Sequence, residues 1–202
     1  MYSPKKLCGF EKNHFYIDSN LALADELKKY FSNPGTEYLW KLVTNRQKMA
    51  YALRNTEMVS LRSLTGDFSQ LNSTNQYNQV MSVGNSDLMN ISPLFQKTVQ
   101  WMEQALISAG AEKVEWGRIF FSKHFANSDI GEHVDEGKYF DYYDRFHFVI
   151  DQTDNENIFH IRDEDVKLLK GNFYWVNNHV PHWLKNNSEK NRINLIADAR
   201  LL

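Results

Sequence analysis

Residues 144–151, which read DRFHFVID, carry the alternation that decides the fold of this chain. Successive side chains of a strand point to opposite faces, so Arg145, His147 and Val149 would share one face and the phenylalanines the other. Two polar, potentially cationic groups would be costly in a dry core. Their face is therefore either turned to water or part of a polar lumen that binds an anion.

Several neighbouring segments share this strand character, because aromatic and β-branched residues dominate them. In the last of them, Arg192 shares a face with Asn194 and Ile196. Five or six strands with short connections favour a small antiparallel barrel or jelly roll. The predicted segments are 114–125, 131–135, 144–151, 157–162, 172–177 and 190–199.

The first half of the chain begins with a short predicted strand over 12–17 and a helix over about 20–31. Asp18 or Ser19 can cap the start of this helix, and Asn33-Pro34-Gly35 marks its end. Helices that precede the strands would buttress one outer face of the barrel.

A second helix follows a stretch that is harder to interpret. Ser92 is its expected N-cap, Pro93 suits its first position, and Gly110 ends it. Residues 57–64 predict a strand, whereas 65–90, rich in Ser, Asn, Gln, Thr and Gly, predict a long loop.

Length and composition indicate one domain over 1–202. We expect a helical and loop region over 1–111, which contributes to a substrate pocket, and a β core over 112–202. With 42% hydrophobic residues, the chain can form a full core. The single cysteine, Cys8, excludes an internal disulfide and fits a reducing compartment.

The net charge of −2 favours neither nucleic acid nor an anionic membrane as a partner. The start of the sequence lacks the apolar run of a signal peptide, and no run of 18 apolar residues exists. A cytoplasmic protein is therefore expected, and its oligomeric state stays open.

Three residues suggest a metal site. His133 and Asp135 are two apart, so on a strand they would point to the same side, and His182 would join them from a second strand-rich segment. A His-x-Asp pair alone commonly arises by chance. With a distant His it matches the triad that holds Fe(II) on one face and leaves other positions open. His179 is a second candidate for the distant His.

The segment 182–198, HWLKNNSEKNRINLIAD, resembles the C-terminal core of the aspartyl/asparaginyl β-hydroxylase-like family. Members include peptide Asx hydroxylases and free-proline cis-hydroxylases. They carry a metal His, an Arg ten residues later and an apolar strand that ends in Asp. In this sequence His182, Arg192 and Asp198 match that pattern. The family's Arg-x-His strand resembles residues 145–147, and a Ser eleven residues before the first metal His resembles Ser122.

The resemblance implies a double-stranded β-helix of the cupin type that uses Fe(II), O₂ and 2-oxoglutarate. It also implies roles for individual residues. His133 and His182 would bind the metal, joined here by Asp135. Arg192, with Ser122, would bind the distal carboxylate of 2-oxoglutarate.

Arg145 and His147 would contact the end of 2-oxoglutarate nearest the metal. Two departures from the animal peptide hydroxylases stand out. Arg145 follows His133 by twelve residues, three more than in those enzymes, and Asp135 supplies an acidic ligand that they lack. The acidic ligand favours the bacterial, small-molecule side of the family. The extra residues enlarge the loop over 136–144, a candidate lid.

The leading hypothesis is a dioxygenase that hydroxylates an amino acid or a peptidyl side chain of Asx or Pro type and releases succinate and CO₂. The alternative is a metal-binding cupin without 2-oxoglutarate chemistry, either an isomerase or a metabolite-binding module. A third hypothesis is a non-catalytic interaction domain. Arg62, Arg118 and Tyr139 are weaker candidates for substrate binding.

Overall fold

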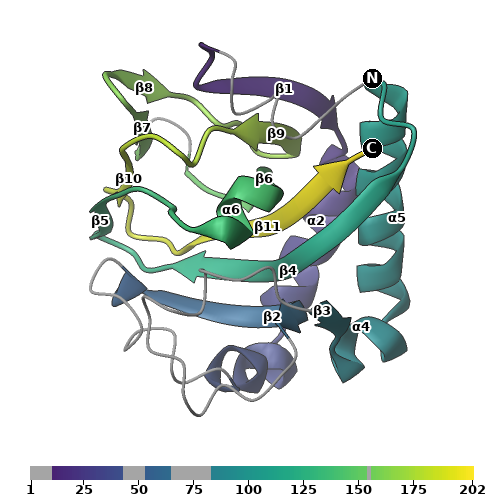
Figure 1. Ribbon diagram of the computed structural model, residues 1–202. Helices are drawn as coiled ribbons and strands as arrows, with labels where there is room; N and C mark the ends of the chain where they lie inside the picture. Colours follow the sequence, from purple (N-terminus) through teal and green to yellow (C-terminus); the bar gives the residue numbers. More distant parts are fainter. Residues whose placement is uncertain (1–10, 43–52, 65–82, 154–155) are drawn as a thin grey trace, which may run out of the picture.

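The computed structural model describes residues 11–42, 53–64, 83–153 and 156–202. Two antiparallel sheets form its framework (Figure 1). The larger has seven strands in the order β1-β9-β6-β11-β4-β2-β3, and the smaller has four in the order β5-β10-β7-β8. The strands are β1 (His14–Ser19), β2 (Thr56–Leu64), β3 (Val83–Asn85), β4 (Val114–His124), β5 (Ser128–His133), β6 (Asp144–Asp151), β7 (Asn157–Ile161), β8 (Glu164–Val166), β9 (Asn172–Val176), β10 (His182–Asn186) and β11 (Arg192–Leu201).

Helices α2 (Leu21–Phe31) and α5 (Pro93–Ser108) pack against the outer face of the larger sheet (Figure 1). Shorter helical segments are η1 (Pro34–Lys41), α4 (Asp87–Ile91) and α6 (Lys138–Tyr142). No helix in the described ranges is long and apolar enough to cross a membrane.

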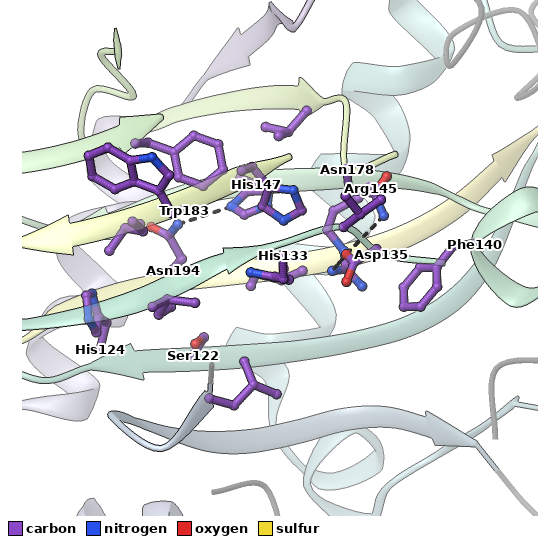
Figure 2. Close-up of a pocket in the computed structure, with 18 of the residues that line it drawn as sticks. Ser122, His124, His133, Asp135, Phe140, Arg145, His147, Asn178, Trp183 and Asn194 are labelled. Carbon is purple, nitrogen blue, oxygen red and sulfur yellow. Dashed lines mark hydrogen bonds and ion pairs between the residues drawn. The ribbon is translucent and has the colours of Figure 1, made fainter. Parts of the chain in front are cut away.

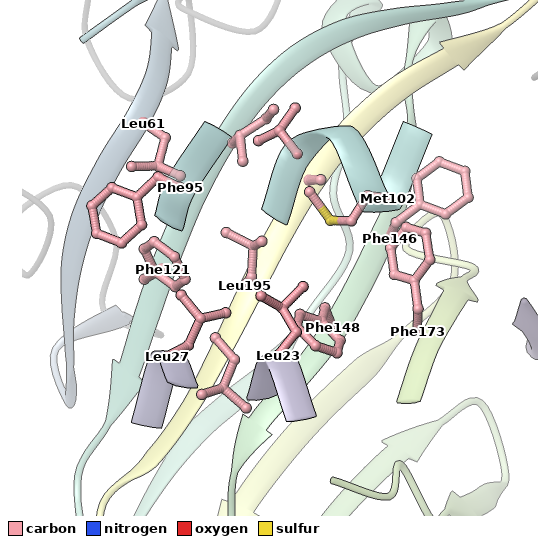
Figure 3. Close-up of a cluster of buried hydrophobic side chains, with 14 of the residues drawn as sticks. Leu23, Leu27, Leu61, Phe95, Met102, Phe121, Phe146, Phe148, Phe173 and Leu195 are labelled. Atoms are coloured by element: carbon pink, nitrogen blue, oxygen red, sulfur yellow. The ribbon is translucent and has the colours of Figure 1, made fainter. Parts of the chain in front are cut away.

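The main hydrophobic core fills the space between these helices and the larger sheet (Figure 3). Phe146 and Phe148 of β6 point into it, while Arg145 and His147 line a cavity on the opposite face. The predicted alternation in β6 is therefore confirmed, and the polar face is turned to a cavity. On β11, Leu195 enters the core in the same way.

A second, smaller cluster joins the two sheets. Val149 and Tyr174 come from the larger sheet, and Phe159, Ile161 and Leu184 from the smaller one. These contacts hold the sheets face to face beside the polar cavity. The predicted mainly β jelly roll, a double-stranded β-helix buttressed by helices, is confirmed.

The second predicted helix is also confirmed at its ends. The Ser92 hydroxyl accepts a hydrogen bond from the Phe95 amide (3.4 Å), and Pro93 occupies the first turn. Gly110 has φ of 112°, a conformation that favours glycine just beyond a helix.

Several predicted details were wrong. Asn20, instead of Asp18 or Ser19, caps α2 by accepting from the Leu23 amide (3.0 Å). The loop expected over 65–90 contains β3 and α4 in its described part, while 65–82, like Cys8, lies outside the described residues. The strand expected over 131–135 ends at His133, because β10 pairs with β5 only up to that residue.

The first half of the chain contributes more to the sheet than expected. Strands β1, β2 and β3 add to both edges of the larger sheet, and β2 pairs with β4 over most of its length. Three elements, β8, β10 and α6, were not predicted from the sequence, and β10 carries His182. The inner surface of the sheet therefore depends on residues from both halves.

Candidate functional site

A cavity of about 480 Å³ lies between the two sheets, and Phe140 of α6 is among the residues that line it (Figure 2). Both sheets contribute polar side chains to its wall, together with the loops after β5 and β9. The polar lining residues are Arg118, Ser122, His124, His133, Asp135, Glu136, Arg145, His147, Asn178, His182, Arg192 and Asn194.

His133, Asp135 and His182 meet in this cavity. One ligand atom from each lies within 4.8 Å of the others, which is close enough to surround a single metal ion. His133 and His182 face each other because they are register partners on the adjacent strands β5 and β10. Asp135 joins them from beyond the strand, where its amide donates to the Asn178 carbonyl (3.0 Å).

Backbone carbonyls fix both imidazole rings. Nδ1 of His133 lies 2.8 Å from the Gly131 carbonyl oxygen, and Nδ1 of His182 lies 2.9 Å from that of Val180. A carbonyl only accepts hydrogen bonds, so each Nδ1 carries the proton and each Nε2 keeps a lone pair. This is the arrangement that metal-binding histidines adopt. The donor set therefore fits a divalent metal ion.

Asp135 is held ionised. Burial alone would raise its pKa, but Arg145 and the two histidines outweigh burial and lower the pKa to about 2. One of its oxygens, Oδ2, accepts from Arg145 and from the Asn178 side-chain amide (3.1 Å). Because both contacts use Oδ2, Oδ1 of Asp135 is the oxygen available to a metal.

Arg145 lines the cavity beside Asp135. Its guanidinium forms ion pairs with Asp135 and with Asp198, whose Oδ1 lies 2.8 Å from Arg145 Nε. Asp198 also accepts from Arg118 (3.0 Å) and from the Tyr139 hydroxyl (3.1 Å). Through these ion pairs Arg145 orients Asp135 beside the cavity that it also lines.

Arg192 lies in the same cavity as a buried cation, with 4% of its surface exposed. Its Nε donates to the side-chain oxygen of Gln152 (3.1 Å), and its Nη2 lies 2.8 Å from the Asn194 side-chain amide, whose oxygen accepts. Both acceptors are neutral. Within the described ranges no carboxylate lies within 4.0 Å of Arg192, and burial lowers the pKa of its guanidinium.

Ser122 and His147 lie beside Arg192. Ser122 is the register partner of Asn194 across β4 and β11, and His147 Nδ1 lies 3.3 Å from the Asn194 amide. Burial, with Arg145 and Arg192 nearby, places the pKa of His147 well below its usual value. His147 is therefore a neutral hydrogen-bonding group at neutral pH.

The structure does not bring all of the weaker candidates to the cavity. Arg118 lines it, with its guanidinium over the rings of Tyr139 and Phe140. Arg62, on β2, instead donates to the Gly117 carbonyl of β4 (3.3 Å) and to the Asn85 side chain of β3. Its donors are used there within the sheet.

Tyr139 is fully buried outside the cavity. Its hydroxyl accepts from the Arg118 amide (2.9 Å) and donates to Asp198. Its close approach depends on Gly117, where a Cβ would lie 2.7 Å from the hydroxyl oxygen. The expected lid over 136–144 therefore contains a short helix anchored by a buried tyrosine.

His124 lines the cavity, although no pattern in the sequence marks it as a site residue. The residue follows Ser122 by two positions on β4 and is the register partner of Arg192. Both ring nitrogens are buried without a hydrogen-bond partner. Its position two residues after Ser122, on the same strand face, is the signal that could have found it.

His179, the alternative ligand, lies apart from the metal-binding atoms. Its Nε2 contacts the Phe140 carbonyl oxygen (2.9 Å), and its amide donates to the Asn177 side chain (3.2 Å). These contacts join the turn before β10 to α6. The three-residue cluster found within the described ranges contains His182 and not His179.

Solved structures share this fold at low sequence identity. A viral collagen prolyl hydroxylase from Paramecium Bursaria Chlorella virus-1, in complex with 2OG, aligns with TM-score 0.52 and 11% identity over 97% of this chain and 99% of its own. A 2OG-Fe(II) oxygenase-family oxidoreductase from Burkholderia pseudomallei aligns with TM-score 0.51 and 11% identity, over 72% and 67%. None of the curated proteins matches in sequence.

The fold and the paired histidines with an acid define the jelly-roll class of 2-oxoglutarate- and Fe(II)-dependent hydroxylases. Residues 58–200 match the family model for aspartyl/asparaginyl β-hydroxylase. The chain belongs to this family, and the match begins well before the segments that carried the resemblance in sequence.

Proposed function

We propose that this protein hydroxylates an amino acid or a peptidyl side chain of Asx or Pro type, with His133, Asp135 and His182 holding Fe(II). The observation that carries the proposal is the pairing of this triad with a buried cation, Arg192, in one cavity. A metal-binding cupin without 2-oxoglutarate chemistry has no use for such a cation.

Arg192 has the chemistry to receive the distal carboxylate of 2-oxoglutarate. A guanidinium has five N–H donors, and its acceptors in the described ranges are two neutral amides. An unpaired buried charge is costly, so a carboxylate that pairs with Arg192 gains a charge-assisted contact. Ser122, on the neighbouring strand, has a hydroxyl that suits the same carboxylate.

Each residue around the metal has a defined task. His133 and His182 present Nε2 lone pairs, and Asp135 presents the oxygen that Arg145 leaves available. When bound, Fe(II) and 2-oxoglutarate supply the oxidation that uses O₂. The overall change converts a C–H bond to C–OH, while 2-oxoglutarate becomes succinate and CO₂.

Other side chains would position the substrate and exclude water. Phe120, Phe140 and Ile196 form an apolar wall in the same cavity, and Arg118 lies at their side with its charge shared by Asp198. Such a wall suits a small aliphatic group held near the metal. Glu136 is exposed at the rim, where it can attract a cationic amino group.

Turnover of 2-oxoglutarate tests this proposal. Purified protein with Fe(II), O₂ and 2-oxoglutarate is offered free amino acids and short peptides that contain Asp, Asn or Pro. We expect one group of substrates to raise succinate formation and to gain one oxygen atom by mass spectrometry. Loss of succinate formation in His182→Ala would connect turnover to the triad. No succinate with any substrate, or succinate formation that does not depend on the triad, would contradict the proposal.

A further inference from the structure

His124 is buried, with only 2% of its surface exposed, and neither of its ring nitrogens has a hydrogen-bond partner. Buried polar atoms are nearly always hydrogen-bonded, since leaving one unsatisfied is destabilising. The ring lines the cavity between the sheets (Figure 2). The His124 ring is therefore suited to form a hydrogen bond with a ligand that enters the cavity.

The position of His124 indicates what that ligand is. His124 and Arg192 are directly opposite each other on β4 and β11, and directly opposite residues of an antiparallel pair have neighbouring side chains. Figure 2 shows His124 with Asn194 toward one end of the cavity, while Asp135, Arg145 and Phe140 lie toward the other. His124 therefore belongs to the end that holds the buried cation.

The charge at this end favours an anion. The Arg192 guanidinium is balanced by no carboxylate within the described ranges, and it contributes to holding His124 neutral. Burial is the main cause of the lowered pKa of His124, about 4; Arg192 adds to this shift, and Asp129 opposes it. A neutral imidazole has one N–H donor, which suits a carboxylate oxygen that Arg192 also contacts.

We infer that His124 is a co-substrate-binding residue that donates to the distal carboxylate of 2-oxoglutarate, so that Arg192 and His124 hold that carboxylate from adjacent strands. The inference rests on the proposed function, because it assigns Arg192 the same carboxylate. It adds a specificity determinant. The pair selects 2-oxo acids with a second carboxylate over those of equal length without one.

Binding measured without turnover separates this role from a structural one. The protein is loaded with Mn(II) under anaerobic conditions and titrated by calorimetry with 2-oxoglutarate and with 2-oxopentanoate, which has a methyl group in place of the distal carboxylate. We expect His124→Phe to reduce the preference for 2-oxoglutarate by about 10- to 100-fold, since a hydrogen bond to a charged group is lost. His124→Gln, which keeps an N–H donor, should recover part of the preference.

His14→Phe is the matched control, because His14 lies on β1 and does not line the cavity. It should leave the preference unchanged. Thermal unfolding of the metal-free protein gives a second measurement. His124→Phe should be at least as stable as the original chain, since an unsatisfied polar ring has been removed.

The outcomes distinguish this inference from the proposed function. If Arg192→Met loses the preference and His124→Phe keeps it, His124 has no role in co-substrate binding and the proposed function stands. If His124→Phe weakens both ligands equally and also lowers the unfolding temperature, its role is structural and the inference is wrong. If the original protein does not bind 2-oxoglutarate, both are wrong.

Discussion

Arg145 is ion-paired with Asp135, the carboxylate two residues beyond His133. The same guanidinium pairs with Asp198 on β11, so the loop after β5 is tied to the larger sheet. Asp135 lies outside any strand, and this pair with the Asn178 contact is what orients it. The position of Asp135, the proposed acidic ligand, thus depends on a residue of the opposite sheet.

Replacement of Arg145 should weaken metal binding. Partners that orient a ligand typically contribute 10- to 100-fold in metal affinity, so we expect a loss in about that range for Arg145→Gln. Arg145→Lys should lose less metal affinity, because it keeps the positive charge, although it lacks the planar set of donors of a guanidinium. The measurement is Mn(II) affinity by calorimetry, with Arg62→Gln as a control outside the cavity. Equal affinity in Arg145→Gln would show that Asp135 needs no such support.

The ligand set makes a second prediction. His133→Ala, Asp135→Ala and His182→Ala should each lose tight Mn(II) binding, because two ligands rarely hold a metal in a defined geometry. His179→Ala should keep it, since His179 contacts a backbone carbonyl. Loss of binding in His179→Ala with retention in His182→Ala would reverse the assignment.

Arg192→Met should raise the 2-oxoglutarate requirement sharply and leave the fold intact. Truncating one partner of a buried charged pair costs on the order of 2–5 kcal/mol, which is roughly 30-fold or more in affinity. Without 2-oxoglutarate the stability should change little, because a buried charge with no carboxylate partner is removed while Gln152 and Asn194 each lose a donor. Unfolding in urea and calorimetric titration with 2-oxoglutarate provide the two readouts. Unchanged 2-oxoglutarate affinity would remove Arg192 from the co-substrate site.

Tyr139→Phe should destabilise the protein and spare substrate affinity. The variant loses the hydroxyl that contacts Asp198 and the Arg118 amide, and one unsatisfied buried group costs about 1–3 kcal/mol. Urea unfolding measures the first effect and KM for substrate the second. Tyr142→Phe, on the same helix, is the comparison. A large rise in KM without loss of stability would restore Tyr139 to substrate binding.

His124 should also contribute to acid sensitivity. Its pKa is about 4 in the folded protein against 6.5 when exposed, so the unfolded state binds more protons between these values. Its pKa shift therefore has no effect on stability above about pH 6.5 and destabilises the fold increasingly as pH falls toward 4. Unfolding free energies at pH 7 and pH 5 should differ less in His124→Phe than in the original chain. The pKa of His160 is raised by Asp165, so His160→Phe should not reduce that difference. An equal difference in all three proteins would contradict this assignment.

The sequence predicted the faces of β6 and β11 because alternation determines them locally. It did not predict that Arg145 meets Asp135, since this contact depends on how two sheets pack. Strand β10 was missed because it is five residues long and has polar Lys185 and Asn186 at its end. His124 was missed because a lone histidine has no sequence pattern, and its meaning came from its partner across the sheet.

Succinate formation, compared between the original protein and two variants, tests the central claim most directly. With Fe(II), O₂, 2-oxoglutarate and a substrate found by screening, the original protein should form succinate and hydroxylated product in equal amounts. His182→Ala should form neither at a measurable rate, and His179→Ala should remain active. Succinate formation that persists in His182→Ala, or product that forms without 2-oxoglutarate, would contradict the account.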